Sequence, residues 1–88
     1  MNESTCNVDG SGNKRWTNPS NQYHRVGGPA IEYANGDKAW YIHDKRHRID
    51  GPAMKWANGI KEYWYKGEMI AKKRYYSEIF QIKIIMEE

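Results

Sequence analysis

The sequence predicts a mainly β fold, an antiparallel meander of repeated β-hairpins with a helix at the carboxyl end. The first observation is an internal repeat: residues 24–46 and 47–69 align without a gap, with nine identities over a period of 23 residues. The second is an Asn-Gly pair in each copy, which is a strong hairpin signal. The third is an aromatic-rich composition without leucine, which suits rings stacked across strands. A fixed period in this range is the signature of a repeat architecture.

The 88 residues form a single domain, which divides along the repeat. We expect a flexible amino terminus over residues 1–11, a degenerate half repeat over 12–23, two full repeats over 24–46 and 47–69, and a carboxyl-terminal segment over 70–88.

The half repeat is inferred from a Gly-x-Lys-x-Trp pattern that occurs at residues 12–16 and again at 36–40, with a spacing of 24. The extra position indicates one inserted residue near Pro19.

Each full repeat contains the signal for its own hairpin. A two-residue type I′ turn needs positive φ at both central residues, and the Asn-Gly pairs at 35–36 and 58–59 adopt it at little cost. In the resulting register Lys55 faces Glu62 across the second hairpin, as a complementary charge pair.

This register sorts the side chains onto two faces of the predicted sheet. The bulky face, which we place against the core, carries Ile31, Tyr33, Lys38, Trp40, Ile42, Met54, Trp56, Lys61, Tyr63 and Tyr65. The other face is thin and mixed, and it carries Ala30, Glu32, Ala34, Ala39, Tyr41, Ala53, Lys55, Ala57, Glu62 and Trp64. Tyr41 and Trp64 are therefore large rings on an otherwise thin face.

A second reversal follows each hairpin. The pairs at 43–44 and 66–67 occupy equivalent positions and contain Asp or Gly, which tolerate the left-handed conformation of a tight return. The Gly-Pro pairs at 28–29 and 51–52 mark where new strands begin, since proline lacks a ladder donor. Neither hairpin can bury a broad aromatic face alone, so the second copy covers and extends the first.

The carboxyl-terminal segment fits two periods. Apolar residues recur at helical spacings of four, three and four from Tyr75 to Met86, whereas residues 80–84 alternate apolar and polar as a strand would. We favour a helix, because an open meander with one apolar face needs a lid. The isoleucines of this segment favour a strand.

The motifs HRxDGPA and NGxKxW resemble MORN-related repeats, in the variant found in bacteriophage and large-virus proteins. The resemblance covers residues 24–69, with 12–16 as a fragment. It implies successive antiparallel hairpins laid side by side, with roles in protein association or scaffolding. The first repeat departs from the pattern at residues 26–27, and Ile70 stands where a third histidine is expected, so the array is predicted to stop near residue 70.

Composition narrows the cellular setting. Cys6 is the only cysteine, which excludes an internal disulfide and a thiolate zinc cluster and fits a reducing compartment. The sequence shows no secretory signal pattern and no apolar run of about 18 residues. We expect a soluble cytoplasmic protein without membrane contact, located in the host cytoplasm if the chain is viral. The formal charge of +3 permits an acidic partner without demanding one.

The sequence contains no recognisable pattern for a metal site or a catalytic site. A metal site would join His24, His43 and His47, but no Asp, Glu or Cys set completes a coordination sphere at a recognisable spacing. No nucleophile stands beside a base in a recognisable pattern. We expect no catalytic residue, no enzyme activity, no metal and no cofactor.

Arg25 and Arg48 recur with the repeat, so we expect them to tie one unit to the next. The alternative is that their forked donors, together with Lys72 and Lys73, bind an anion.

The leading hypothesis is a non-catalytic protein-binding module, a phage-encoded factor that binds and modulates or inhibits a host protein. Recognition is predicted through Tyr41 and Trp64 with the adjoining basic residues Lys45, Arg46 and Arg48. The alternative is single-stranded nucleic acid, or an anionic ligand, bound by the basic turn and tail. Exposed sheet edges also predict association between copies of the chain.

Overall fold

A computed structural model describes residues 4–82 and confirms the mainly β fold with a carboxyl-terminal helix. These residues contain nine strands: β1 (Thr5–Val8), β2 (Lys14–Thr17), β3 (Ile31–Glu32), β4 (Lys38–Ala39), β5 (Tyr41–Ile42), β6 (Lys45–Arg46), β7 (Met54–Lys55), β8 (Lys61–Tyr65) and β9 (Glu68–Ile70). The helix starts as α1 (Lys72–Arg74), widens into a π-helical turn at Tyr75–Ile79, and continues to residue 82. The part of the predicted tail beyond residue 82 lies outside the described residues.

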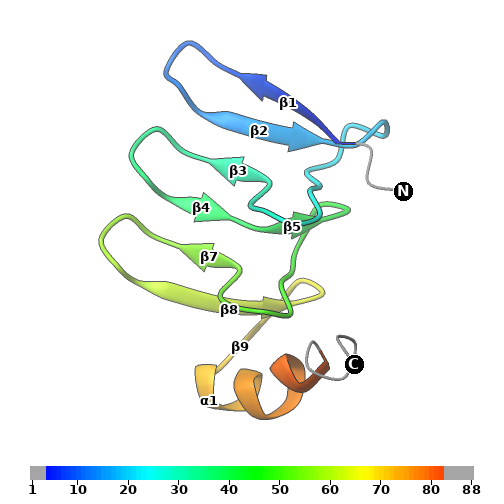
Figure 1. Cartoon of the computed structure of the whole chain (residues 1–88), viewed down its shortest axis with the longest axis vertical. Helices are drawn as coiled ribbons and strands as arrows, with labels where there is room; N and C mark the ends of the chain where they lie inside the picture. The colour runs from blue at the N-terminus through cyan, green and yellow to red at the C-terminus, as the bar shows by residue number, and fades with distance from the viewer. Residues whose placement is uncertain (1–3, 83–88) are drawn as a thin grey trace.

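Seven of these strands form one antiparallel sheet in the order β1-β2-β3-β4-β7-β8-β9, and β5 pairs with β6. Figure 1 shows the three hairpins β1–β2, β3–β4 and β7–β8 stacked in chain order, with the helix at the far end. The 23-residue period is visible in the strand bounds, since β3 corresponds to β7 and β6 corresponds to β9. The expected meander of hairpins is therefore present.

The segment predicted to be a flexible amino terminus contains strand β1, which makes the half repeat a complete hairpin. The Asp9 carboxylate holds the turn, because it accepts the backbone N–H groups of Ser11 and Asn13 at 2.9 and 3.0 Å. An ion pair with Arg15 at 2.8 Å, supported by the Asn13 contacts, keeps the pKa of Asp9 well below its usual range. The sequence signal for this turn was Asp-Gly-Ser-Gly.

The inserted residue of the first unit lies in its second reversal. Thr17 pairs with Tyr23 across five intervening residues, whereas Tyr41 pairs with Arg46 across four. Asn21, at φ 62°, supplies the left-handed residue of the longer turn.

The Asn-Gly turns differ from the prediction by one residue. Tyr33 donates its N–H to the Asp37 carbonyl at 2.9 Å, and Gly36 donates to the Tyr33 carbonyl at 3.0 Å, so the loop holds three residues. Only Gly36, at φ 101°, has positive φ, which defines a turn closed by one left-handed glycine. Asn35 stays right-handed because its side-chain oxygen accepts the Asp37 N–H at 2.9 Å.

Hydrogen bonds between neighbouring turns favour this longer loop. Ala34 donates its N–H to the side chain of Asn13 at 2.8 Å, and Ala57 donates to the equivalent Asp37 carboxylate at 2.6 Å. Each hairpin turn is thus fastened to the turn of the unit before it.

The longer loop shifts the hairpin register by one residue. Ile31 lies opposite Ala39, and Lys55 lies opposite Lys61, so the predicted pairing of Lys55 with Glu62 is wrong. The two type I′ turns instead occur at the second reversals, where the residues at 43–44 and at 66–67 all have positive φ. The predicted reversals at these two positions are confirmed.

The shifted register also changes the core. One buried cluster contains Ile31, Ala39 and Met54, with Tyr23 and Tyr41 packed against it. Ala39 and Tyr41 had been assigned to the thin face, and they reach the core because a one-residue slip exchanges the two faces of a strand.

Two rings of the predicted core face are exposed at the hairpin turns. Tyr33 and Trp56 retain 36% and 37% of their accessible surface, whereas Met54 and Tyr63 are buried as predicted. The correction follows from the loop, because Tyr33 and Trp56 close the three-residue turns instead of lying within strands.

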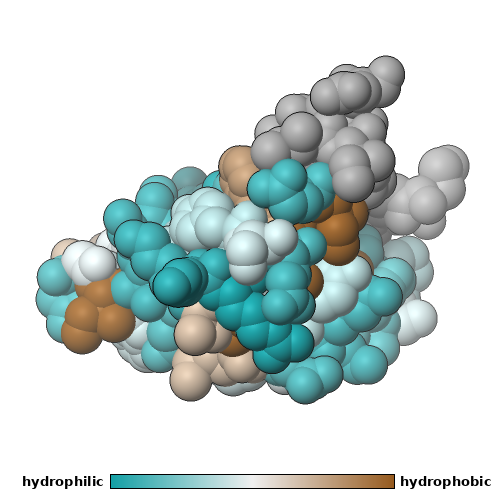
Figure 2. All heavy atoms as spheres, turned by 90° about the horizontal axis from the view of Figure 1, so that it is seen from below, coloured by the Kyte–Doolittle hydropathy of each residue, from teal (hydrophilic) through white to brown (hydrophobic). Residues whose placement is uncertain are grey.

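The helix covers the carboxyl end of the sheet. Tyr75 is fully buried, and its ring centroid lies 4.9 Å from that of Tyr63 in a second core cluster completed by Ile79. Seen from this end, the described surface is mostly hydrophilic, with apolar atoms confined to separate patches (Figure 2). The helix therefore acts as the predicted lid. Within residues 4–82, no helix is long and apolar enough to cross a bilayer.

Candidate partner-binding site

Arg25 and Arg48 make equivalent contacts in successive units. The Cζ atom of Arg25 lies 3.9 Å from the ring centroid of Trp16, and that of Arg48 lies 4.1 Å from the ring centroid of Trp40. Each arginine stacks on the tryptophan of the preceding unit, and each donates from Nη1 to a proline carbonyl four residues later, at 3.2 and 3.0 Å. The expectation that these arginines tie the units together is confirmed.

Two glycines leave space for these guanidinium groups. A Cβ atom at Gly28 or at Gly51 would lie 2.9 Å from the Cζ atom of the arginine three residues earlier. The repeated motif HRxxGPA thus encodes one local structure, in which a glycine lets the arginine lie flat between loop and ring.

Carboxylates complete the surroundings of both arginines. Arg25 pairs with Glu32 at 3.4 Å, and Arg48 pairs with Asp50 at 2.8 Å. Each guanidinium therefore already contacts a ring, a carbonyl and a carboxylate. Anion binding by Arg25 and Arg48 stays a prediction, and it would require a ligand that competes with these contacts.

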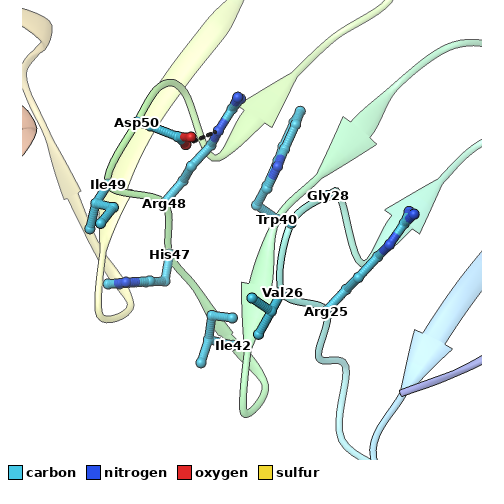
Figure 3. Close-up of a pocket in the computed structure, with 10 residues that line it drawn as sticks. Arg25, Val26, Gly28, Trp40, Ile42, His47, Arg48, Ile49 and Asp50 are labelled. Carbon is cyan, nitrogen blue, oxygen red and sulfur yellow. Dashed lines mark hydrogen bonds and ion pairs between the residues drawn. The ribbon is translucent and has the colours of Figure 1, made fainter. Parts of the chain in front are cut away.

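A groove of 440 Å³, here called the inter-repeat groove, runs between the loop that carries Arg25 and the loop that carries Arg48. It is lined by Arg25, Val26, Gly27, Gly28, Trp40, Ile42, His47, Arg48, Ile49 and Asp50. Figure 3 shows Arg25, Trp40 and Arg48 projecting in one direction, with Val26 and Ile42 at the other end. Arg48, predicted to belong to the partner site, lies in this groove.

A second depression, here called the basic hollow, contains the other four predicted partner-binding residues. It has a volume of 410 Å³ and is lined by Tyr41, Asp44, Lys45, Arg46, Trp64, Lys66 and Gly67. The residues come from β5, β6 and β8 and from the two type I′ turns. Sequence reasoning missed Lys66, although its equivalence to His43 places it at the same turn position one unit later.

Arg46 occupies the centre of the ring pair. Its Cζ atom lies 5.7 Å from the Tyr41 centroid and 5.1 Å from the Trp64 centroid, and its Nε donates to the Tyr41 hydroxyl at 3.1 Å. Glu62 holds Arg46 and Trp64 together, because its carboxylate pairs with Arg46 at 3.7 Å and accepts the Trp64 indole N–H at 3.1 Å. The rings are therefore half-buried parts of a fixed cluster.

His24 and His47 hold the two type I′ turns in place. The Nδ1 atom of His24 accepts the N–H of His43 at 3.1 Å, and the Nδ1 atom of His47 accepts the N–H of Lys66 at 3.0 Å. Both imidazoles must be neutral at Nδ1 to accept. Burial lowers the pKa of His24 and of His47. The neighbouring His43 lowers the pKa of His24 further, and Lys66 does the same for His47.

Among residues 4–82, no three potential metal ligands of the His, Cys, Asp and Glu types cluster together.

The basic tail does not join the basic hollow. Lys72 and Lys73 are exposed on α1, and Lys72 borders a separate depression shared with Lys61 and Met69. Figure 1 places α1 at the lower left and the turn after β5 on the right.

Comparisons of the chain with protein-family models, curated proteins and solved structures find no match. The resemblance to MORN-related repeats therefore depends on the sequence motifs alone.

Proposed function

We propose that the protein is a non-catalytic protein-binding module that recognises an acidic segment of a partner through the basic hollow. One observation supports this above all others: Arg46 lies between Tyr41 and Trp64, and Lys45 and Lys66 are exposed at the rim. Tyr, Trp and Arg are the residue types that dominate binding energy at protein interfaces. Four residues selected from the sequence meet in this hollow.

Charge gives the hollow its preference for an acidic segment. The Arg46 charge is offset by Glu62, and the Asp44 carboxylate accepts the Tyr23 N–H at 2.7 Å. In the described part of the chain neither Lys45 nor Lys66 forms an ion pair, so against the single Asp44 carboxylate the two lysines leave the hollow with a net positive charge. Such rim charges accelerate encounter with an acidic partner and make the association rate sensitive to salt.

Preorganisation supports the same proposal. The two rings and the guanidinium are already held by hydrogen bonds, and the lysines sit beside tight two-residue turns fastened by His24 and His47. The two rings and the guanidinium would therefore lose little side-chain entropy on binding, which favours affinity from a small surface. That the partner is a host protein, bound and modulated or inhibited by a phage-encoded factor, is part of the proposal and follows from the motif resemblance alone.

Charge reversal at the rim tests this proposal without disturbing the core. The test variant is Lys45→Glu with Lys66→Glu, and the matched control is Lys72→Glu with Lys73→Glu, because all four lysines are exposed and both pairs change the charge equally. Both variants should keep the wild-type melting temperature. Crosslinked partners captured from bacterial lysate and identified by mass spectrometry should be lost from the test variant and kept by the control.

The captured protein is then purified and titrated directly against the three forms of the chain. We expect affinity for the test variant to fall about tenfold or more, since each interfacial charge reversal is costly. Equal affinity for the test variant and the control would rule out the basic hollow as the binding surface.

Single-stranded nucleic acid is the second candidate for the same hollow. The observation that favours it is the combination of two half-buried rings with a guanidinium and two exposed lysines, which suits stacking beside a phosphate backbone. This candidate predicts binding of an oligonucleotide with a steep inverse dependence on salt. Absence of oligonucleotide binding at low salt would eliminate it.

A further inference from the structure

The two ends of the hairpin stack are built differently. The helix covers the carboxyl end, where Tyr75 is buried against Tyr63. The amino end finishes in β1, whose four residues are all exposed, and Figure 1 shows no described element beyond it. Repeat arrays need a polar cap at each end to remain separate in solution.

The backbone of β1 presents hydrogen-bonding groups outward. Asp9 donates its N–H to the Asn13 carbonyl at 3.0 Å, which fixes the alternation of the antiparallel ladder between β1 and β2. By this alternation Thr5 and Asn7 bond toward β2, while the N–H and C=O groups of Cys6 and Val8 point away from the sheet. Within residues 4–82 these four outward groups have no partner.

Strand β1 is short, but it lacks the charges, prolines and bulges that usually protect an edge. It contains no lysine, arginine or proline, and its pairing with β2 runs through four consecutive residues without a bulge. Val8 keeps 61% of its accessible surface. The strand is neutral, with an open ladder along its outer side.

We propose that β1 pairs with β1 of a second copy about a twofold axis, joining two seven-stranded sheets edge to edge. Twofold-related edges pair antiparallel, which continues the order found between all neighbouring strands of the sheet. A neutral strand meets its own copy without charge repulsion. The register that uses all four outward groups places Cys6 of one copy opposite Val8 of the other, and Asn7 opposite Asn7.

This register gives a specific crosslinking test. Residues at a pair without direct hydrogen bonds have Cα atoms about 4.5 Å apart, a distance that a disulfide spans. The test variant is Cys6→Ser with Asn7→Cys, which puts two thiols across the axis. The control is Cys6→Ser with Ser11→Cys, whose thiol lies on an exposed turn away from the axis.

The full-length chain is studied by sedimentation across a wide concentration range and by mild oxidation of the two variants. We expect a dimer that dissociates on dilution, and a disulfide-linked dimer that forms about tenfold faster from the Asn7→Cys variant than from the control. The variant Cys6→Pro removes one outward N–H, which an edge strand tolerates, and should be a folded monomer.

A wild-type chain that stays monomeric at the highest concentration would overturn the proposal. So would a dimer in which Asn7→Cys crosslinks no faster than Ser11→Cys, because that dimer would use another surface. Persistence of the dimer in a folded Cys6→Pro variant would likewise place the contact away from β1.

Discussion

Replacing Tyr75 with phenylalanine removes one buried and one partly buried hydrogen bond while leaving the ring in place. The Tyr75 hydroxyl donates to the Arg48 carbonyl and accepts the N–H of Gly51 at 3.3 Å. Both bonds reach the loop between His47 and β7, so this hydroxyl joins the helix to the loop that carries Arg48. Tyr75→Phe would leave a carbonyl and an N–H without a partner at a position where the tyrosine is fully buried.

Each buried polar group left without a partner costs about 1–3 kcal/mol, so the two groups freed by Tyr75→Phe should lower the free energy of unfolding by roughly 2–6 kcal/mol. A chain of this length has about 4–13 kcal/mol in total, so the loss should be plain in urea titrations followed by tryptophan fluorescence. The matched control is Tyr76→Phe, whose partly exposed hydroxyl lies 3.5 Å from the Tyr63 hydroxyl. That control should stay within about 0.5 kcal/mol of the wild type.

Alkaline titration gives a second readout, which reports the burial of the Tyr75 hydroxyl. Burial raises the pKa of Tyr75, and also that of Tyr63, to about 12. Because the unfolded chain ionises first, near the ordinary value of 10.0, this stability is present below that pH and is lost as pH rises toward 12. The decrease in the free energy of unfolding between pH 10 and pH 12 should be smaller in Tyr75→Phe, which has one fewer buried hydroxyl to ionise. If Tyr75→Phe and Tyr76→Phe are equally stable at neutral pH, the helix does not dock on the loop that carries Arg48.

Three further changes test other parts of the structure. Stability should decrease as pH falls below 6.5, because the pKa values of His24 and His47 are lowered in the folded state, and thermal unfolding of His47→Gln should show a shallower decrease. Gly51→Ala should cost about 1–3 kcal/mol by displacing the adjacent guanidinium, whereas Gly10→Ala, with nothing within 4 Å, should be nearly neutral in the same urea assay. Asp37→Ala should cost about 1 kcal/mol by freeing the N–H of the next turn, and Asp37→Asn should restore most of it.

The fold class followed from the repeat, and the detailed pairing did not. Periodicity predicted successive hairpins and the second reversals, because Asp and Gly at those positions permit left-handed backbone. The Asn-Gly pairs were misassigned by one residue, because the Asn35 side chain and the turn of the next unit stabilise a three-residue loop. Such contacts join segments about twenty residues apart, and a local propensity cannot include them.

The candidate site was predicted in part for a similar reason. Tyr41 and Trp64 were singled out as large rings on a thin face, and they do meet Lys45 and Arg46 in one hollow. Their packing around Arg46 could not be inferred, since it depends on how β6 folds back over β5. The first strand was missed because its signal, the Asp9 turn, does not resemble the later Asn-Gly turns.

Hydrogen exchange at the junctions between units tests most directly whether the units form one continuous sheet. Trp16 and Trp40 donate their N–H groups across these junctions to Ala30 and Ala53, at 2.8 and 2.7 Å, whereas Ala30 and Ala53 donate within their own units. Native-state exchange measured by NMR should show all four amides opening only with global unfolding. Exchange at Trp16 and Trp40 orders of magnitude faster than at Ala30 and Ala53 would mean that the units fold separately and would contradict a shared sheet.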